Sequence, residues 1–404
     1  MSRSFLLVLL LLFTPGASVR PLPELIQHEI IGSNNGSSPR RDLGYLTSET
    51  GNTMDDCWLS SGENWQSLEN RQNYAFCAQG FGKNALGGFG GKYYWVTDNS
   101  DSATNPKTGT LRHAVIQPDK LWILFEHDME IVLEQELMIS SYTTIDARDR
   151  KVSLTGNSGL TVQFANNVII TGLEIYNMAS AGNAFVRDSP THSGYRTQSD
   201  GDGIGLFTAK NVWIDHCELY HCTDGLVDVI QGSTNVTISN SFFHDHNEAI
   251  LLGAHDNYAD DVNMKITVAY NWFGDNITQR TPRIRFGFAH VLNNYWPCGW
   301  NMYAVGGSDG STILAEGNIF VAPDSSWLKE VTHRQDTSPV NFISKHNEFD
   351  NYAYFVESGS LPETYQRASL LSATNAVNVR AVTAQAGTLW SNHKGHTEET
   401  CGQY

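Results

Sequence analysis

Three segments near the middle of the chain repeat one pattern: NVIITGLEIYN at 167–177, NVWIDHCELYH at 211–221 and NVTISNSFFHD at 235–245. In each of them β-branched or aromatic residues alternate with polar ones, which is typical of short strands. Further copies follow as KITVAYNWFGD from Lys265, AHVLNNYW from Ala289, TILAEGNIF from Thr312 and NFISKHNEF from Asn341. Asn or another small polar residue marks the bend between two short strands.

The spacing of the copies indicates how they pack. The segments that begin at 167, 211, 235 and 265 are 44, 24 and 30 residues apart, and 44 equals two coils of about 22 residues, a period typical of stacked supersecondary units. The LxxLxL pattern of leucine-rich repeats is missing, and propeller blades need longer periods with hairpins. We therefore predict an all-β fold, a right-handed parallel β-helix, with a β-sandwich as the structural alternative. Long insertions at 181–199 and 247–264 are expected to form loops on one side, where binding sites usually lie.

Composition excludes several classes of protein. The 404 residues contain 26 Lys and Arg against 43 Asp and Glu, a formal charge of −17, which argues against nucleic acid as a partner because phosphate binding needs a cationic face. With 35 glycines and only 17% charged residues, long helices and coiled coils are disfavoured.

The N-terminus reads MSRSFLLVLLLLFTPGASVR, with a basic residue, an apolar run and then small residues. This pattern predicts a secretory signal peptide over 1–19. The alternative, a membrane anchor, is disfavoured because the run is much shorter than the ~20 residues that a span needs. We expect a flexible lead-in over 20–50, the repeat domain over 51–375 and a tail over 376–404 that packs on the coils or frays.

Six cysteines in a secreted chain make disulfides plausible. They are Cys57, Cys77, Cys217, Cys222, Cys298 and Cys401. Cys57 and Cys77 flank one segment and are the favoured pair, whereas no CxxC pair supports a zinc site. Glycosylation sequons begin at Asn35, Asn235 and Asn276, and the last two are expected to be hindered by the repeat core.

Acidic residues recur at the repeat period. Asp200 and Asp224 each stand eleven residues before an Asn that opens a copy, and Glu248 follows 24 residues after Asp224. Asp202 and Asp228 lie close to these in sequence. Stacked carboxylates repel one another, and a hard divalent cation with oxygen ligands would relieve that repulsion. We predict a Ca²⁺ site here, with a solvated acidic face as the alternative.

Three arginines follow in QRTPRIRFG at 279–287. Arg280 falls close to the next rung on the line of the acids, with Arg283 and Arg285 beyond it. Guanidinium groups can grip carboxylates in a bidentate manner, so the pattern favours a polymer of carboxylates as ligand. Charge balance for the neighbouring acids is the alternative.

These motifs together resemble the plant-type pectate lyases, a family of secreted parallel β-helix polysaccharide lyases that includes pollen allergens. The matching stretches are DDCW at 55–58, GFGKNALGG at 80–88, SDGDGI at 199–204, NVWIDHCELYHCTDGLVDV at 211–229, AILLG at 249–253 and QRTPRIRFG at 279–287. The likeness covers roughly residues 50–325.

The resemblance implies a site and a reaction. It implies Ca²⁺ ligands at Asp200, Asp224 and Asp228, with Asp202 as a further candidate. It implies that Arg280 is catalytic and that Arg285 binds a substrate carboxylate. The implied partner is polygalacturonate (pectate), which the family cleaves by β-elimination. We expect a secreted monomer that acts in the cell wall, binds no nucleic acid and has no membrane span.

Two other functions stay open at this point. Many members of the family carry a lysine where this chain has Glu248, so a catalytically weak or inactive pectin-binding wall protein is one alternative. A polygalacturonase-like hydrolase is the other, because it would use paired carboxylates, but it would not explain the arginines.

Overall fold

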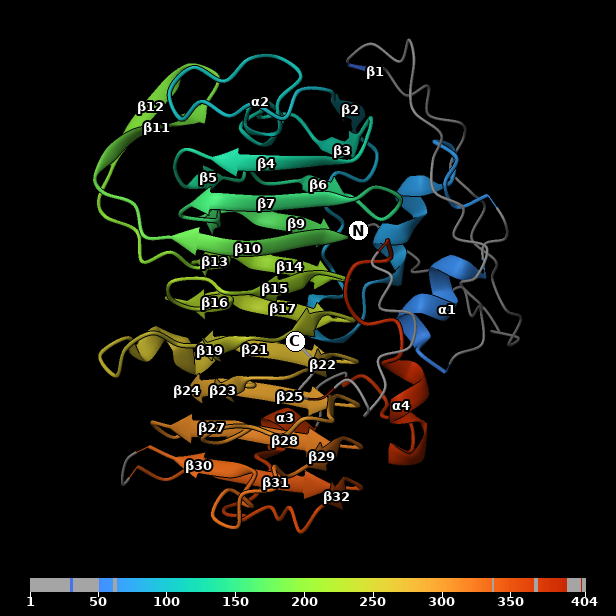
Figure 1. Ribbon diagram of the computed structural model, residues 1–404, viewed down its shortest axis with the longest axis vertical. Coiled ribbons are helices and arrows are strands. Elements are labelled where there is room, and N and C mark those ends of the chain that lie inside the picture. The colour runs from blue at the N-terminus through green and yellow to red at the C-terminus, as the bar shows by residue number, and fades with distance from the viewer. Residues whose placement is uncertain are drawn as a thin grey trace, which may run out of the picture.

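The computed structural model describes residues 30–31, 51–60, 64–335, 338–366, 370–390 and 401. The predicted signal peptide, most of the lead-in and the sequon at Asn35 lie outside these residues. Within them the chain forms a right-handed parallel β-helix whose three long sheets run the length of the molecule (Figure 1). The predicted fold class is therefore confirmed, and no sandwich of antiparallel sheets forms in the described part.

Sheet A contains, in spatial order, β1 (Ile30–Ile31), β2 (Lys92–Val96), β3 (Leu121–Phe125), β6 (Thr143–Asp146), β9 (Asn166–Thr171), β14 (Lys210–Asp215), β17 (Thr234–Ser239), β21 (Lys265–Ala269), β25 (Phe288–Leu292), β28 (Thr312–Glu316) and β31 (Asn341–Lys345). Sheet B contains β4 (Met129–Leu133), β7 (Val152–Asn157), β10 (Leu173–Ala179), β15 (Glu218–Tyr220), β18 (Phe242–Phe243), β22 (Trp272–Phe273), β26 (Tyr295–Trp296), β29 (Ile319–Val321) and β32 (Glu348–Asp350). Sheet C contains β5 (Leu137–Met138), β8 (Leu160–Gln163), β13 (Ile204–Phe207), β16 (Val227–Ile230), β20 (Ile250–Leu252), β24 (Arg283–Arg285), β27 (Val305–Ser308) and β30 (Thr332–Arg334).

The bends between sheets A and B explain why Asn recurs in the sequence. Asn240 and Asn293 adopt left-handed backbone conformations, with φ of 48° and 50°, which Asn tolerates better than most residues. Just beyond the bend, buried Asn side chains stack from coil to coil: the amide of Asn271 donates to Asn294 at 2.9 Å, and Asn294 donates to Asn318 at 3.1 Å. Each amide thus satisfies its buried neighbour.

The interior is filled by columns of like side chains, because residues one coil apart lie directly above one another. One aromatic column runs Phe243, Phe273, Trp296, Phe320, Phe349, with successive rings stacked 4.3–5.8 Å apart. Trp272 and Tyr295 are also buried, as expected for core residues. Burial of these rings stabilises the stack mainly through the hydrophobic effect.

Short helices and connections cover the outside of the coils. They are α1 (Thr53–Leu59), η1 (Arg71–Cys77), η2 (Gly80–Gly82), α2 (Leu111–Val115), η3 (Ala259–Asn263), α3 (Glu363–Gln366), η4 (Ala376–Asn378) and α4 (Val379–Val382). The N-terminal helices flank sheet A (Figure 1), and in α4 the buried Val379 packs with Phe242 and Tyr295. The domain boundary near residue 375 remains a prediction. In the described ranges no helix is both long and apolar enough to cross a bilayer.

The cysteines form two disulfides. Cys57 bonds to Cys77, as favoured from the sequence, and Cys298 bonds to Cys401, 103 residues further along the chain. Cys217 and Cys222 are buried as free thiols.

The insertion at 181–199 differs from expectation. It folds as an antiparallel hairpin of β11 (Ala184–Ser189) and β12 (His192–Arg196), rather than as an irregular loop. The hairpin projects from the side of the coils (upper left in Figure 1). A second small pair, β19 (His246–Glu248) with β23 (Ile277–Gln279), lies where sheet B gives way to sheet C.

Candidate active site on the outer face of sheet C

The outer face of sheet C brings the predicted acids and arginines together. In β13 Ile204 and Leu206 point into the core, as do Val227 and Val229 in β16, whereas the alternate residues of these strands face outwards. Strand pairing places Asp228 beside Leu251, and Leu251 beside Arg283, so an acid and a cation share one outward column. Arg285 lies two residues on and therefore also faces out. The site is positioned by the stack itself.

Four aspartates lie at the edge where the chain enters this sheet. Asp200, Asp202 and Asp224 are in the connections before β13 and β16, and Asp228 is in β16. Burial raises the pKa of Asp202 to about 7, and repulsion from Asp224 and Asp200 adds to the rise. Burial and the charges of Asp202 and Asp224 raise the pKa of Asp228 well above that of an ordinary carboxyl group. Repulsion between the carboxylates therefore contributes to the raised pKa values of both residues.

The ladder of acids is displaced from the register expected from the sequence. Ile204 pairs with Val227, and Val227 with Ile250. These two steps of sheet C therefore advance by 23 residues, one less than the 24 that separate paired residues of β14 and β17. The turn after β16 is one residue longer than the turn after β13, and it absorbs the difference. As a result Asp224 lies beside Gly201 rather than Asp200, and Asp202 beside Gly225, whose N–H donates to Asp202 Oδ1 at 2.9 Å.

The chemistry of these acids fits a hard cation. Asp228 is only 8% exposed, and its buried Oδ1 accepts no hydrogen bond from the described residues. An unpaired buried carboxylate costs free energy that a cation could offset. Among the described residues no three His, Cys, Asp or Glu side chains form a ready-made metal-binding group, so the carboxyl groups would have to turn towards a bound ion. Oxygen donors in this number suit Ca²⁺ better than a softer metal.

Arg280 is held by Glu248. Its Nη2 lies 2.7 Å from Glu248 Oε1, and both side chains are about one-fifth exposed, 20% and 22%. Gln279 Nε2 also donates to that oxygen, at 3.2 Å. Arg280 Nε makes no hydrogen bond within the described part of the chain. Arg280 thus lies next to Glu248, as the repeat period predicted, and the two side chains form an ion pair.

The other two arginines differ in their surroundings. Arg285 donates from Nε to Asp256 Oδ1 at 3.0 Å and from Nη1 to the carbonyl oxygen of Gly253 at 2.9 Å. Arg283 is 2% exposed, and neither its Nε nor its Nη1 has a partner among the described residues. Burial, followed by repulsion from Arg285, lowers the pKa of Arg283 to about 10. Sequence reasoning gave Arg283 no separate role, although its period-2 spacing from Arg285 already placed both on one face.

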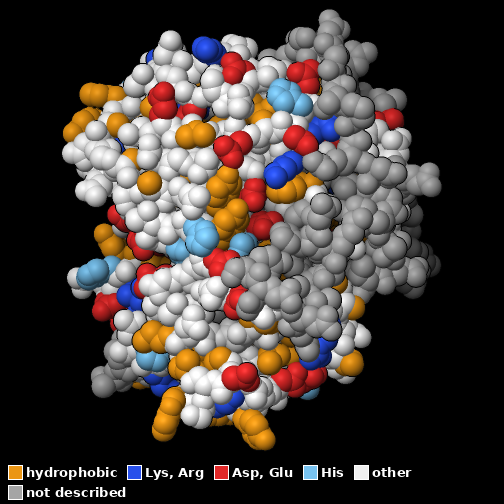
Figure 2. Space-filling view, viewed as in Figure 1, with side chains coloured by type: hydrophobic (Ala, Val, Ile, Leu, Met, Phe, Trp, Pro, Cys, Tyr) orange, Lys and Arg blue, Asp and Glu red, His pale blue; other side chains and the backbone are white. Residues whose placement is uncertain are grey.

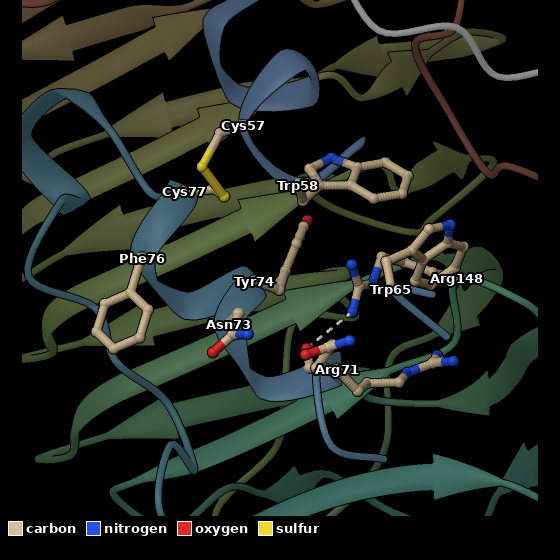
Figure 3. A pocket seen from close by; sticks show the side chains of 10 residues that line it. Cys57, Trp58, Trp65, Arg71, Asn73, Tyr74, Phe76, Cys77 and Arg148 are labelled. Atoms are coloured by element: carbon tan, nitrogen blue, oxygen red, sulfur yellow. Dashed lines mark hydrogen bonds between the residues drawn. A yellow bond between two sulfur atoms is a disulfide. The ribbon is translucent and has the colours of Figure 1, made fainter. Parts of the chain in front are cut away.

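The aromatic hollow beside α1 and η1 is a different kind of pocket. It encloses about 210 Å³, and Trp58, Trp65 and Tyr74 surround the guanidinium of Arg148 there (Figure 3). That guanidinium lies 3.7 Å from the centre of the Tyr74 ring, and its Nη2 is 2.8 Å from Asp146. Its charge is already balanced, so this hollow is part of the structural core and not a second candidate site.

His216 also serves structure. Its Nε2 is 2.9 Å from Asp55, and its Nδ1 is 3.2 Å from the carbonyl oxygen of Gly387. The side chain is completely buried on the sheet A side, where both ring nitrogens have polar partners.

Comparisons with known proteins all point to one family. The family model described as pectate lyase matches residues 135–389. Probable pectate lyase 5 of Arabidopsis thaliana is 47% identical over 375 residues, covering 91% of this chain and 90% of that protein. Pectate lyase of Zinnia elegans is 46% identical over 374 residues, covering 91% and 92%. The crystal structure of jun a 1, the major allergen from cedar pollen, superposes with a TM-score of 0.80 at 40% identity, covering 83% of this chain and 99% of that one.

Proposed function

The chain belongs to the pectate lyase family, and from that premise we propose that it cleaves de-esterified homogalacturonan by Ca²⁺-dependent β-elimination. The observation that carries the proposal is that four aspartates without an ion pair to any described residue share one face with arginines. The buried Oδ1 of Asp228 also accepts no hydrogen bond from the described residues. A polyuronate brings its own carboxylates, which a bound cation and guanidinium groups can hold together.

Asp200, Asp202, Asp224 and Asp228 would hold the cation. When bound, Ca²⁺ would act as a Lewis acid on the C6 carboxylate of the substrate and make the C5 proton more acidic. The residues of the chain itself would transfer the proton and bind the substrate.

Arg280 would accept the C5 proton. The electrons of the C5–H bond form the C4–C5 double bond, the C4–O bond breaks, and the departing glycosidic oxygen takes a proton from solvent. Arg285 would grip the substrate carboxylate and stabilise the negative charge that develops. Because a guanidinium is ordinarily protonated, Arg280 needs neighbouring cations, and it must also leave Glu248, to which it is paired at 2.7 Å.

The pairing with Glu248 favours a second candidate function. A carboxylate on Arg280 competes with the carboxylates of a uronide, so the chain would then bind pectate weakly and turn it over slowly or not at all. The acids and arginines would still give Ca²⁺-dependent binding.

The decisive experiment measures ultraviolet absorbance of unsaturated product from polygalacturonate, with Ca²⁺ or with a chelator. Arg280→Lys should lower kcat by about 10³-fold, within the range for loss of a general base. Arg380→Lys is the matched control, because Arg380 contacts Glu348 and Asp350 far from the site, and it should keep full activity.

The other outcomes identify the alternatives. A flat trace from folded wild-type protein that still binds pectate would establish the binder, and Glu248→Lys should then restore turnover. New reducing ends without absorbance would indicate hydrolysis.

We also propose that the protein is secreted, acts in the cell wall as a monomer and is glycosylated. Asn276 is exposed beside β23, and although its amide donates to Asp245 at 2.8 Å, we expect it to be the better acceptor. Asn235 donates its amide to Asn211, and Thr237 of the same sequon is buried.

A further inference from the structure

A second hollow continues the acidic end of the site towards the N-terminal coils. It encloses about 430 Å³ on the outer face of sheet C, between β8, β13, β16 and the strand that leaves the β11–β12 hairpin. Asp200 and Asp202 form one end of its lining. Gln163, Phe207 and Tyr195 lie further along it. A polymer bound at the aspartates would therefore run directly into this hollow.

The hollow offers no free cation to a carboxylate. Its only Lys or Arg is Arg196, among the described residues that line it. The Nε and Nη2 of Arg196 lie 2.7 and 2.8 Å from the two carboxylate oxygens of Glu136, and Nη1 donates to Gln163 at 2.6 Å. The positive charge of Arg196 is thus balanced within the wall. Beyond the proposed Ca²⁺ ligands at one end, a free uronate carboxylate here would find no unpaired cation among the described lining residues.

Apolar surface takes the place of cations. Phe207 is half-buried and packs edge-on against the exposed ring of Phe164, with ring centres 5.5 Å apart. Tyr195 is 60% exposed and packs on Phe185 in the hairpin. These rings are held in place by their neighbours while part of their surface faces the hollow, which suits a small apolar group on a sugar.

The register relates this hollow to the arginines. Gln163 pairs with Phe207, and Phe207 with Ile230, in one outward column. Two coils further on, the same column reaches Arg285, because Val229 pairs with Leu252 and Leu252 with Ile284. Phe207 and Arg285 are thus three coil steps apart, about 14 Å at the spacing of parallel strands. One polymer can contact both.

We propose that this hollow binds a methyl-esterified galacturonosyl residue, a neutral sugar ester, while the arginine end binds free uronates. The inference rests on the proposed function and makes it more specific: the substrate would be partly esterified pectin cut at the border between free and esterified stretches. The methyl ester would remove a charge for which the described lining has no free counterion, and its methyl group would lie against the rings of Phe207 and Tyr195.

The test compares fully de-esterified polygalacturonate with partly methyl-esterified pectin. Wild-type products, sized by mass spectrometry, should carry a methyl ester at one fixed distance from the cleaved bond. Two variants add a positive charge to the hollow by different routes, Phe207→Lys directly and Glu136→Gln by releasing Arg196. Each should lower the ratio of kcat/KM for esterified over de-esterified polymer by about fivefold, the size expected for one partly exposed charge pair. The control is Val132→Lys, which adds the same charge on the exposed face of β4 in sheet B and should leave the ratio unchanged.

Esters scattered at random in the products, or a ratio unchanged in both hollow variants, would overturn the inference while leaving the lyase intact. If wild type makes no unsaturated product from any polymer, the proposed function fails instead. In that case calorimetric binding of partly esterified and de-esterified oligogalacturonides to wild type and Phe207→Lys decides the inference independently. Preference of wild type for the esterified ligand, lost in the variant, would support it, and equal preference would refute it.

Discussion

Two clusters of buried acids lie on different sheets of the β-helix, and their pKa values shift in opposite directions. On sheet A, Asp146 accepts from the Nε of Arg71 at 2.8 Å and from the Nη2 of Arg148 at 2.8 Å. Burial alone would raise the pKa of Asp146, but the two guanidinium groups hold it well below its usual range. On sheet C, Asp202 and Asp228 lie among other acids, and their pKa values rise.

The comparison shows how to separate structural from functional acids in this fold. Both clusters contain acids that are buried rather than fully exposed to solvent. Only the sheet A cluster contains its own counterions, so it is complete within the chain. The sheet C cluster leaves Asp228 Oδ1 without a described partner and so calls for a charge from outside. On the face that sheet B presents, a third group of His and acidic side chains gathers over β15 and β18 (Figure 2), where His244 lies 2.8 Å from Asp245 and 3.4 Å from Glu218.

The largest effect is expected from breaking the complete cluster. Asp146→Asn would leave Arg71 and Arg148 buried with one carboxylate fewer, and the free energy of unfolding should fall by about 3–5 kcal/mol. Urea unfolding measures this, with Asp119→Asn, an exposed site, as the control. A loss no larger than in the control would mean that the cluster on sheet A does not stabilise the fold.

Completing the other cluster should have the next largest effect. Free Ca²⁺ at 100 times its dissociation constant should raise the free energy of unfolding by about 2.7 kcal/mol relative to chelator, because only the folded state binds the ion. Asp228→Asn should abolish most of that rise. An equal rise in the variant would place the ion elsewhere, and no rise in wild type would contradict the calcium site.

A further buried network on the sheet A side, in which His216 contacts Asp55, should make stability depend on pH. Burial alone would lower the pKa of His216, but Asp55 and Asp215 outweigh it and raise the pKa to about 9. A pKa raised above the unfolded value of about 6.5 means that the stabilisation is complete below pH 6.5 and is lost as pH rises through 9. The linkage relation gives about 3 kcal/mol as an upper bound for this shift, and we expect a loss of about 2 kcal/mol across that window, measured by urea unfolding in chelator. His216→Asn should flatten the curve, and an unchanged slope in that variant would refute the assignment.

The smallest expected effect concerns the free energy that the unpaired Asp228 carboxylate costs the fold when no Ca²⁺ is bound. In chelator, Asp228→Asn should increase the free energy of unfolding by about 1 kcal/mol, because it removes a buried group whose charged form lacks a partner. Asp200→Asn, at an exposed position, should change it by less than about 0.5 kcal/mol. A clear loss of stability for Asp228→Asn would show that its carboxylate is already satisfied.

Much of the site could be predicted from the sequence, because its parts obey the repeat period. The spacing placed Asp224, Glu248 and Arg280 on successive coils, and the ion pair between Glu248 and Arg280 agrees. The exact register could not be predicted. One residue more in the turn between sheets C and A shifts the acids relative to the Asn markers of sheet A, and turn length is not visible until both strands are located.

By itself the sequence determined the β-helix and the alignment of acids and arginines along it, because strand alternation and coil period are local patterns that repeat. It favoured the Cys57–Cys77 disulfide without deciding it, and the structure shows that bond. Only the tertiary structure decided which acids have counterions. Arg71 and Asp146 are 75 residues apart, and Glu136 reaches Arg196 across 60. Such pairs depend on how outer segments fold back over the coils, and no period in the sequence encodes that contact.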